Sequence, residues 1–444
     1  MEKSRRRLKL CDPAPLTAFL IILFLFLDFN GANIVSFNQW STRSQIEDQN
    51  SFISLIARLV RGEDRKKLET TGYACDVAEN SLVCASNQGV RIETSKNISV
   101  YTSSIGTGQD ASSVKPYALQ KDKYLLQWIT LVNILHGAKN PPACQYNHTV
   151  PAVIFSSGIL GNIFHEFNDI IIPLFITTNH FKSQILFILE DYDAWFVSKF
   201  SKILSRLSRY QVMNPAANAT VHCFPGMILG LRYHDNLALN PVDIPGGYSM
   251  RDFRQFLAAA YSLKFAHVSQ VIVKEPVVML LSREKSRKFL NKEEIVRMIR
   301  GLGFTVVVAR TKDALNIDKF GNMINSCAVL VGAHGAGLTN ELFLPAGAVM
   351  VQVEPVGLEW AASKYYGDPA RAMGVHYLRY KIEPEESSLV ELYGRNDSVI
   401  TDPESFYGMG YRLARSVYLE QQDIRVNVDR FRKTMVQALK LVAN

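Results

Sequence analysis

The sequence lacks the patterns that mark several common functional classes. It has no low-complexity tract and no internal repeat, which excludes disordered scaffolds and solenoid proteins. It also has no C-x-x-C pair and no H-E-x-x-H helix, so a structural zinc site has little support. What remains is a globular composition, 48% hydrophobic and 20% charged, in 444 residues that have room for two or three domains.

The formal net charge of +8 does not by itself indicate a nucleic-acid partner. Five of the lysines and arginines lie within the first ten residues, MEKSRRRLKL, so much of the excess charge belongs to a short N-terminal tail. The remaining excess is spread thinly, and no basic stripe alternates with aromatic residues. We therefore expect a mildly basic globular protein that does not bind nucleic acid.

An apolar run, Leu16–Leu27, follows this tail and ends at Asp28. A bilayer span needs about 20 residues, and a run of roughly 10 to 14 is also typical of a signal-peptide core. Basic residues before the run keep the N-terminus in the cytosol, so either interpretation places the remainder in the lumen. No A-x-A-like cleavage site follows promptly, which favours a single-pass type II signal anchor over 16–35 behind a cytosolic tail over 1–15.

Cysteines and glycosylation motifs agree with a lumenal location. Cys75 and Cys84 lie nine positions apart in a polar stretch, and we expect them to close a small disulfide loop. Cys144 and Cys223 can form a second bond, whereas Cys327, inside an apolar strand, is expected to be a buried small hydrophobe. Four N-x-S/T sequons are candidate glycosylation sites, at Asn97, Asn147, Asn218 and Asn396.

Strand-like and helix-like segments alternate from Val153 onward, which predicts an α/β fold. A helix is predicted over 162–181, and Pro173 must kink or divide it. The segment Lys274-Glu275-Pro276 breaks the alternation, which then restarts. The second run contains four predicted strands, over 277–282, 304–309, 327–332 and 348–354.

The two runs of alternation predict two Rossmann-like domains joined by a short linker. Such a pair makes a GT-B arrangement, whose active site lies in the cleft between the domains. We expect a polar stem over 36–71 and an N-terminal acceptor domain over 72–270. A C-terminal nucleotide-sugar domain is expected over 271–405. The C-terminal helices, over 406–444, are expected to return to the first domain.

The segment 329–340, VLVGAHGAGLTN, is predicted to be a strand, a glycine-rich turn and a helix start. Glycines let a ligand approach the backbone, and free N–H groups at the helix start favour an anion such as a diphosphate. The spacing is G-x-x-G-x-G, which does not indicate a dinucleotide, and no Gly-Lys-Ser/Thr follows as in a P-loop. The alternative is a tight packing turn with a structural histidine. The donor-binding candidates in this turn are His334, Gly335, Ala336, Gly337, Thr339 and Asn340.

Basic side chains that follow the first strand of the second domain can neutralise such a diphosphate. Arg283 and Arg287 are four positions apart and share one face if this segment is helical, and Ser282 precedes them. The alternative is a solvated basic loop. Glu354, at the end of a later strand, can hold ribose hydroxyls or cap a turn.

A transfer reaction also needs a base, and the segment HEFND contains candidates. His165 and Asp169 stack on one helical face, so the carboxylate can orient and polarise the imidazole. Glu166 is expected on another, exposed face. Asp235 is a second carboxylate near a strand end. The alternative is a core histidine tied to Asp169 by a structural hydrogen bond.

Several of these segments resemble glycosyltransferase family 61. The resemblance covers residues 72–440 and is carried by VGAHGAGLTNELFLPAGAVMVQVEP, GNIFHEFNDIIIPLF, YHDNLALNP and LSREKSRKFLN. The stretch GGYSMRDFRQFLAAAYSL is most similar to the plant, xylan-modifying branch. The family pattern matches at Gly161, Asn162, His165, Asn168 and Asp169. The resemblance implies a GT-B fold, inversion at the anomeric carbon and no metal requirement. The D-x-D letters at 191–193 are therefore expected to be a helix cap.

The resemblance implies a Golgi enzyme that moves arabinose or xylose from a UDP-sugar onto xylan. No cofactor beyond the donor is expected. The alternatives are a family member that acts on N-glycan or protein acceptors, as a xylosyl- or GlcNAc-transferase, and a catalytically silent carbohydrate-binding protein. No spacing rule separates arabinose from xylose, and association into oligomers stays open.

Overall fold

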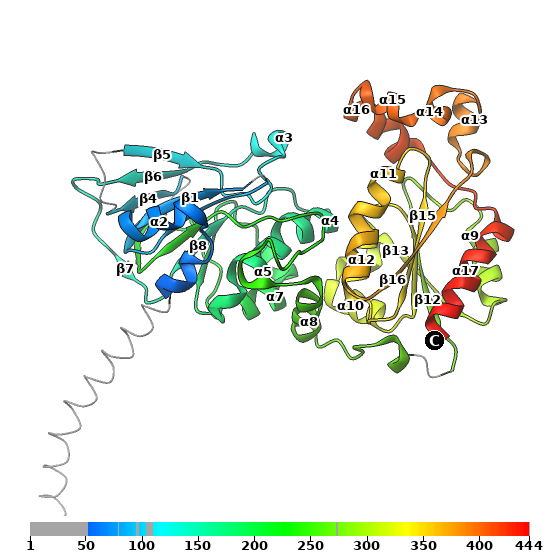
Figure 1. Ribbon diagram of the computed structural model, residues 1–444, viewed down its shortest axis with the longest axis horizontal. Coiled ribbons are helices and arrows are strands. Elements are labelled where there is room, and N and C mark those ends of the chain that lie inside the picture. Colours follow the sequence, from blue (N-terminus) through cyan, green and yellow to red (C-terminus); the bar gives the residue numbers. More distant parts are fainter. Residues whose placement is uncertain (1–51, 79, 95–96, 104–109, 272–273, 444) are drawn as a thin grey trace, which may run out of the picture. The chain divides into compact units, whose positions relative to one another are not determined.

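The computed structural model describes residues 52–443, apart from residues 79, 95–96, 104–109 and 272–273. The predicted tail, the anchor over 16–35 and the first part of the stem lie outside the described residues. Among the described helices, none combines the length and the apolar character that crossing a membrane requires. Residues Ser54–Asn444 form one compact unit, whose elements are labelled in Figure 1.

The first sheet combines antiparallel and parallel strands in the order β1-β2-β11-β8-β9. β1 (Tyr73–Val77) and β2 (Leu82–Ser86) form a hairpin, because their connection is too short for a crossover helix. β8 (Ala152–Phe155) and β9 (Leu186–Leu189) are parallel, as the alternating pattern predicts. β11 (Met227–Leu229) joins the two parts by pairing with both β2 and β8.

A second sheet, of order β5-β6-β4-β3-β10-β7, does not follow from the predicted Rossmann-like pattern. Its strands are β3 (Val90–Thr94), β4 (Ser99–Thr102), β5 (Asp110–Val114), β6 (Val132–His136), β7 (Tyr146–Asn147) and β10 (Thr220–Phe224). Along β3 and β4, buried residues alternate with half-exposed ones. Such alternation is typical of a sheet with one solvated face rather than of a sheet covered by helices on both faces.

The predicted helix over 162–181 forms, but its geometry changes along its length. α4 (Ile163–His165) leads into a π-helical turn, Glu166–Ile171, which leads into α5 (Ile172–Thr178). The N–H of Ile172 bonds to the carbonyl of Phe167, five residues back. Pro173 therefore stands in the first turn of α5, where its missing N–H is tolerated, and it does not divide the helix.

The C-terminal sheet is entirely parallel, in the order β13-β12-β14-β15-β16. Its strands are β12 (Val277–Ser282), β13 (Thr305–Arg310), β14 (Val329–Ala333), β15 (Val349–Glu354) and β16 (His376–Lys381). The first four agree with the predicted strands within two residues, and β16 is an additional edge strand. The chain reverses direction across the sheet between β13 and β14, so the carboxyl ends of β12 and β14 form the switch point where such folds bind ligands.

The last helix, α17 (Val428–Ala443), differs from the expected return to the first domain. It packs on α9 (Lys292–Arg300) and on β15 and β16, within the C-terminal half. Its buried residues, Phe431, Met435, Ala438 and Val442, recur at helical spacing. The physical reason is that a parallel sheet exposes an apolar face on each side, and α17 covers part of one face.

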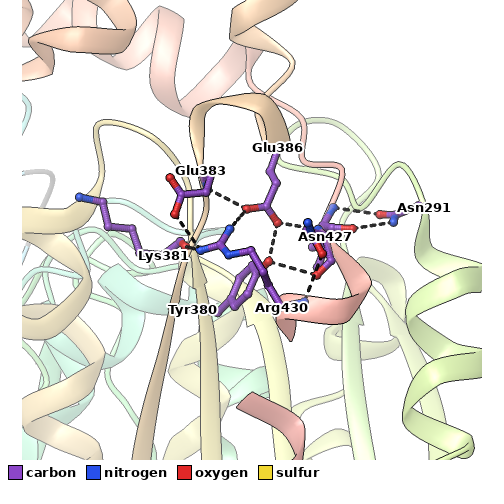
Figure 2. Close-up of polar contacts among 8 residues, drawn as sticks. Asn291, Tyr380, Lys381, Glu383, Glu386, Asn427 and Arg430 are labelled. Carbon is purple, nitrogen blue, oxygen red and sulfur yellow. Dashed lines mark hydrogen bonds and ion pairs between the residues drawn. The ribbon is translucent and has the colours of Figure 1, made fainter. Parts of the chain in front are cut away.

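Polar contacts attach the start of α17 to the sheet (Figure 2). Glu386 accepts hydrogen bonds from the Asn427 N–H and the Tyr380 hydroxyl, and it forms an ion pair with Arg430. Asn291 bonds through its side-chain amide to both backbone groups of Val426. Except for the bond between Tyr380 and Glu386, each of these contacts joins residues more than 40 positions apart in sequence, so no local pattern predicts them.

The compact unit begins before the expected boundary at Gly72. Ile56, Leu59 and Val60 are buried, and α2 (Gly62–Thr71) follows them. The guanidinium group of Arg232 donates to the Leu59 carbonyl at 2.5 Å. The end of the predicted stem is therefore part of the folded unit.

Candidate functional site

A cavity of about 470 Å³ opens at the carboxyl ends of β12 and β14. Residues 281–285, at the end of β12 and in the loop after it, line one side together with the turn after β14. The other side is lined by residues 161–163, ahead of and within α4, and by Trp195 and Lys199 of α6 (Ala194–Lys199). Both halves of the compact unit thus contribute to this cavity.

The glycine-rich turn after β14 brings two guanidinium groups against the backbone. Gly335 has a φ of +146° and leads into a 3-10 helix, Ala336–Phe343. A Cβ atom at Gly335 would lie 2.5 Å from Nη1 of Arg283 and 2.9 Å from Nη1 of Arg287. Glycine is required here because any side chain would displace one of the two arginines.

Arg283 and Arg287 lie in an irregular loop, so the predicted shared helical face is not how they meet. Arg287 donates from Nη1 to the His334 carbonyl at 2.8 Å, and Nε of Arg283 donates to the Ser286 carbonyl at 2.8 Å. Burial lowers the pKa of Arg283. Burial and then the charge of Arg283 lower the pKa of Arg287 to about 10. Neither arginine has an ion-pair partner in the described part of the chain, so the pair can neutralise an incoming anion.

His334 is a neutral histidine at this site. It is almost fully buried, and its Nδ1 lies 2.7 Å from the amide nitrogen of Gln352. Burial, followed by the charges of Arg287 and Arg283, lowers the pKa of His334 to about 3. Because the Gln352 amide donates to Nδ1, the ring proton is on Nε2. The side chain can therefore donate a hydrogen bond but does not add a positive charge.

The other donor-binding candidates divide into two groups. Ser282, Ala336, Gly337 and Asn340 line the cavity, as Arg283 does. Thr339 is fully buried and does not line it.

The prediction that Glu354 holds ribose hydroxyls is wrong in this geometry. Its carboxylate is fully buried, and Arg379 holds both oxygens, at 2.6 Å and 2.8 Å. Arg379 lies on β16, a strand that the sequence pattern did not reveal. The strand end that was expected to hold a ligand is therefore closed by an internal ion pair.

The His165–Asp169 pair forms as predicted. Nδ1 of His165 lies 2.8 Å from Oδ2 of Asp169, and the imidazole is one-third exposed whereas the carboxylate is buried. Asp169 also accepts hydrogen bonds from the Tyr117 hydroxyl at 2.7 Å and from the Asn168 amide at 2.6 Å. Three donors hold the carboxylate, so its position and that of the imidazole are fixed.

The charge of Asp169 controls the protonation of His165. Burial alone lowers the pKa of His165, but the hydrogen bond and the charge of Asp169 outweigh burial. A smaller contribution comes from Asp122, so the pKa of His165 is raised overall. A histidine whose Nδ1–H is held by a buried carboxylate presents Nε2 as a proton acceptor.

The remaining acidic candidates lie elsewhere. Asp235 is exposed, and its Oδ1 accepts the N–H of Asn236 within its own turn. The prediction that Glu166 is exposed is wrong, because its carboxylate is fully buried. Glu166 forms an ion pair with Lys199 and accepts the N–H of Gly161 at 3.0 Å. Glu166 is buried because Lys199, from α6, and the Gly161 backbone cover it, and no spacing along its own helix predicts these partners.

Aromatic side chains connect the His165–Asp169 pair to the glycine-rich turn. The ring of Phe164 lies 5.6 Å from that of His165 and 5.2 Å from that of Tyr365. The Tyr365 ring in turn lies 6.4 Å from that of His334. The candidate base and the two arginines therefore stand on either side of one aromatic cluster.

Sequence reasoning missed several residues of this site. Tyr117 holds Asp169, Lys199 lines the cavity, and the charge of Arg415 acts on His165. Tyr117 and Arg415 lie far from the motifs in sequence, so only the fold reveals them. Trp195 and Lys199 are four positions apart on a predicted helix, which was the one available signal for Lys199.

The modification and disulfide candidates occupy consistent positions. All four sequon asparagines, Asn97, Asn147, Asn218 and Asn396, are exposed. Disulfide bonds join Cys75 to Cys84 and Cys144 to Cys223, and Cys327 is free and buried. In the D-x-D segment, Asp193 caps α6, and Asp191 accepts the N–H groups of Ser157 and Gly158.

Comparison with known proteins gives consistent matches. The model of the family Glycosyltransferase 61 matches residues 163–351. Xylan glycosyltransferase MUCI21 of Arabidopsis thaliana is 31% identical over 97% of this chain and 87% of its own length. Beta-1,2-xylosyltransferase XYXT1 of Oryza sativa subsp. japonica is 37% identical over 76% of this chain and 74% of its own length. Alpha-1,3-arabinosyltransferase XAT3 of the same plant is 35% identical over 82% of this chain, which spans 64% of the length of that relative.

Proposed function

Since the chain belongs to glycosyltransferase family 61, we propose that it is an inverting enzyme that moves a pentose, arabinose or xylose, from a UDP-sugar onto xylan. The names of its relatives support the sugar class and the acceptor, because they include a xylan glycosyltransferase, a xylosyltransferase and an arabinosyltransferase. The relatives do not agree on one donor sugar, so the proposal includes both pentoses.

The single observation that carries the proposal is the pair of arginines beside the glycine-rich turn, of which Arg283 lines the cavity. Arg283 and Arg287 are both packed against Gly335, and neither has an ion-pair partner among the described residues. Two such positive charges at the switch point of a parallel sheet suit the diphosphate of a nucleotide sugar. Protein groups then neutralise the leaving group, and we expect transfer to proceed in the presence of a metal chelator.

The proposed reaction is an in-line displacement. A hydroxyl oxygen of the acceptor attacks the anomeric carbon of the donor as the bond from that carbon to the diphosphate breaks. The hydroxyl proton passes to Nε2 of His165, and Asp169 stabilises the imidazolium that forms. The electron pair of the broken bond leaves with UDP, next to Arg283 and Arg287. Attack from the face opposite the leaving group inverts the anomeric configuration.

The proposal extends to architecture and location. A two-domain GT-B arrangement, with an acceptor half before residue 271 and a donor half after it, agrees with a cavity that both halves line. A signal anchor over 16–35 would hold the enzyme in the Golgi membrane with its folded unit in the lumen. Two disulfide bonds and four exposed sequons support an oxidising, glycosylating compartment.

A donor screen tests the proposal. Residues from Ser36 onward are expressed as a secreted protein and supplied with UDP-xylose, UDP-arabinofuranose or UDP-GlcNAc. Each donor is combined with xylo-oligosaccharides or glycopeptides in EDTA, and product mass is measured. A pentose added to the xylo-oligosaccharide is the expected result. Transfer to the glycopeptide alone would change the acceptor, and xylan binding without consumption of any donor would indicate a silent binder.

A further inference from the structure

Exposed aromatic side chains are few in the described part of the chain, and most of them lie near the candidate site. Among the residues that the structure describes, seven tryptophans and tyrosines are exposed, namely Tyr124, Trp128, Tyr146, Trp195, Trp360, Tyr393 and Tyr411. Trp195 lines the cavity described above. Four others, two in each half of the compact unit, lie on segments that reach His165 or Asp169 through intermediate side chains. A cluster of exposed aromatic side chains usually marks a binding site.

The first pair belongs to α3 (Lys123–Leu126) and the turn after it. Tyr124, in α3, is 71% exposed, and Trp128, in the turn that follows, is 74% exposed. The residue after each of them packs inward, since Leu125 and Ile129 form a buried cluster with Tyr117. Tyr117 donates through its hydroxyl to Asp169. The segment that carries Tyr124 and Trp128 therefore packs against a residue that holds the His165–Asp169 pair in place.

The second pair lies in the C-terminal half. Trp360, in α11 (Glu359–Ala362), is 54% exposed, and its ring lies 5.8 Å from that of Tyr365. Tyr411, the first residue of α16 (Tyr411–Ala414), is 60% exposed. Tyr365 packs on Phe164, the neighbour of His165. The segment before Tyr411 packs at the same place, because the ring of Tyr407, in α15 (Pro403–Gly408), lies 6.0 Å from that of Trp360, and α15 contacts α16.

We propose that Tyr124 and Trp128 on one side of His165, and Trp360 and Tyr411 on the other, are stacking platforms for the sugar rings of a xylan chain. This inference rests on the proposed function. A xylopyranose ring carries no charge and no hydroxymethyl group, so its C–H bonds can lie flat on an aromatic face. Platforms on both sides of the base bind backbone units before and after the reacting unit. The acceptor is therefore an internal unit of the chain, which receives a side branch.

Xylan binding and turnover are measured separately on the full chain in detergent. In affinity electrophoresis, the wild-type protein is retarded by xylan in the gel, and Trp128→Ala and Trp360→Ala are retarded much less. In transfer assays, each substitution raises KM for xylohexaose roughly tenfold, which is the effect of losing one stacked ring, and leaves KM for xylobiose nearly unchanged. Trp128→Phe, which keeps an aromatic face, restores most of the lost affinity.

Tyr146→Ala is the matched control, because Tyr146 is exposed on β7, in the second sheet. Its removal leaves xylan binding and KM unchanged. The platform assignment is overturned if the alanine variants keep wild-type retardation and wild-type dependence on oligosaccharide length, or if the wild-type protein is not retarded by xylan. Absence of transfer from any UDP-pentose by a protein that xylan does retard would instead reject the proposed activity and leave the platforms in place.

Discussion

At the scale of single residues, both the His165–Asp169 pair and the two arginines at the glycine-rich turn depend on charged groups that are largely buried. Asp169 is held by Tyr117 and Asn168 and raises the proton affinity of His165. Arg283 and Arg287 keep positive charge beside the glycine-rich turn although burial opposes it. The arginine arrangement costs folding free energy, because burial opposes the charge, which is typical of sites that are organised for catalysis rather than stability.

Asp169→Asn is expected to lower kcat by roughly 10²- to 10⁴-fold, the range associated with a general base. The asparagine keeps a polar group beside His165 but cannot stabilise the imidazolium. The fold should persist, so the circular dichroism spectrum is the control. Wild-type turnover in the variant would assign His165 a structural role.

The pH profile tests the same pair in a different way. His165 accepts a proton only when it is neutral, so activity rises as pH increases through its pKa. Asp169 raises that pKa, and removing its charge in Asp169→Asn moves the acid limb of the kcat profile to lower pH. An acid limb that stays in place in the variant would show that another group is titrating.

Arg283→Ala is expected to reduce kcat/KM by the equivalent of roughly 2–4 kcal/mol, as loss of a group that stabilises developing charge does. Arg297→Ala removes an exposed arginine of α9 and should leave kcat/KM unchanged. Isothermal titration with UDP provides a second readout, in which only Arg283→Ala weakens binding. Equal UDP affinity in the two variants would exclude Arg283 from the diphosphate site.

At the scale of elements, the turn after β14 is the part with least freedom to change. Gly335→Ala should weaken UDP binding by about tenfold or more, because the new methyl group would displace the arginine at 2.5 Å and strain a backbone with φ of +146°. Gly301→Ala, at the end of α9, meets only backbone oxygens, at 3.4 Å and 3.5 Å, and should be nearly neutral. UDP titration and thermal unfolding of both variants separate a local effect from loss of the fold.

At the scale of the whole molecule, the two disulfide bonds close loops of very different length. Cys144 and Cys223 are 79 positions apart, whereas Cys75 and Cys84 are 9 apart. Closing a longer loop removes more entropy from the unfolded chain, so serine replacement of Cys144 and Cys223 should cost about 4–5 kcal/mol. The same replacement of Cys75 and Cys84 should cost about 3 kcal/mol. Urea unfolding of the two double variants measures the free energy of unfolding that each disulfide bond contributes. A larger loss for the Cys75–Cys84 replacement would show that native packing around the hairpin dominates.

The sequence predicted those features that depend on neighbouring residues. Four of the five parallel strands of the C-terminal half follow from apolar runs bounded by turns, and the pairing of His165 with Asp169 follows from their spacing of four. The positions of Gly335 and its two arginines also follow, although the arginines meet through a loop rather than a helix. The resemblance to family 61 was visible in the same segments and is supported by the relatives.

The tertiary structure alone decided which charges stay free and which are paired inside the protein. In the sequence, Glu354 and Glu166 cannot be distinguished from any other carboxylate near the end of a strand or helix. Arg379, from an unexpected strand, pairs with the first, and Lys199, from another helix, pairs with the second. Likewise, Tyr117 is brought to Asp169 from 52 positions away. Spacing along one element determines what that element can present, but the partner that neutralises or supports a buried charge comes from a distant segment, and only the folded chain brings the two together.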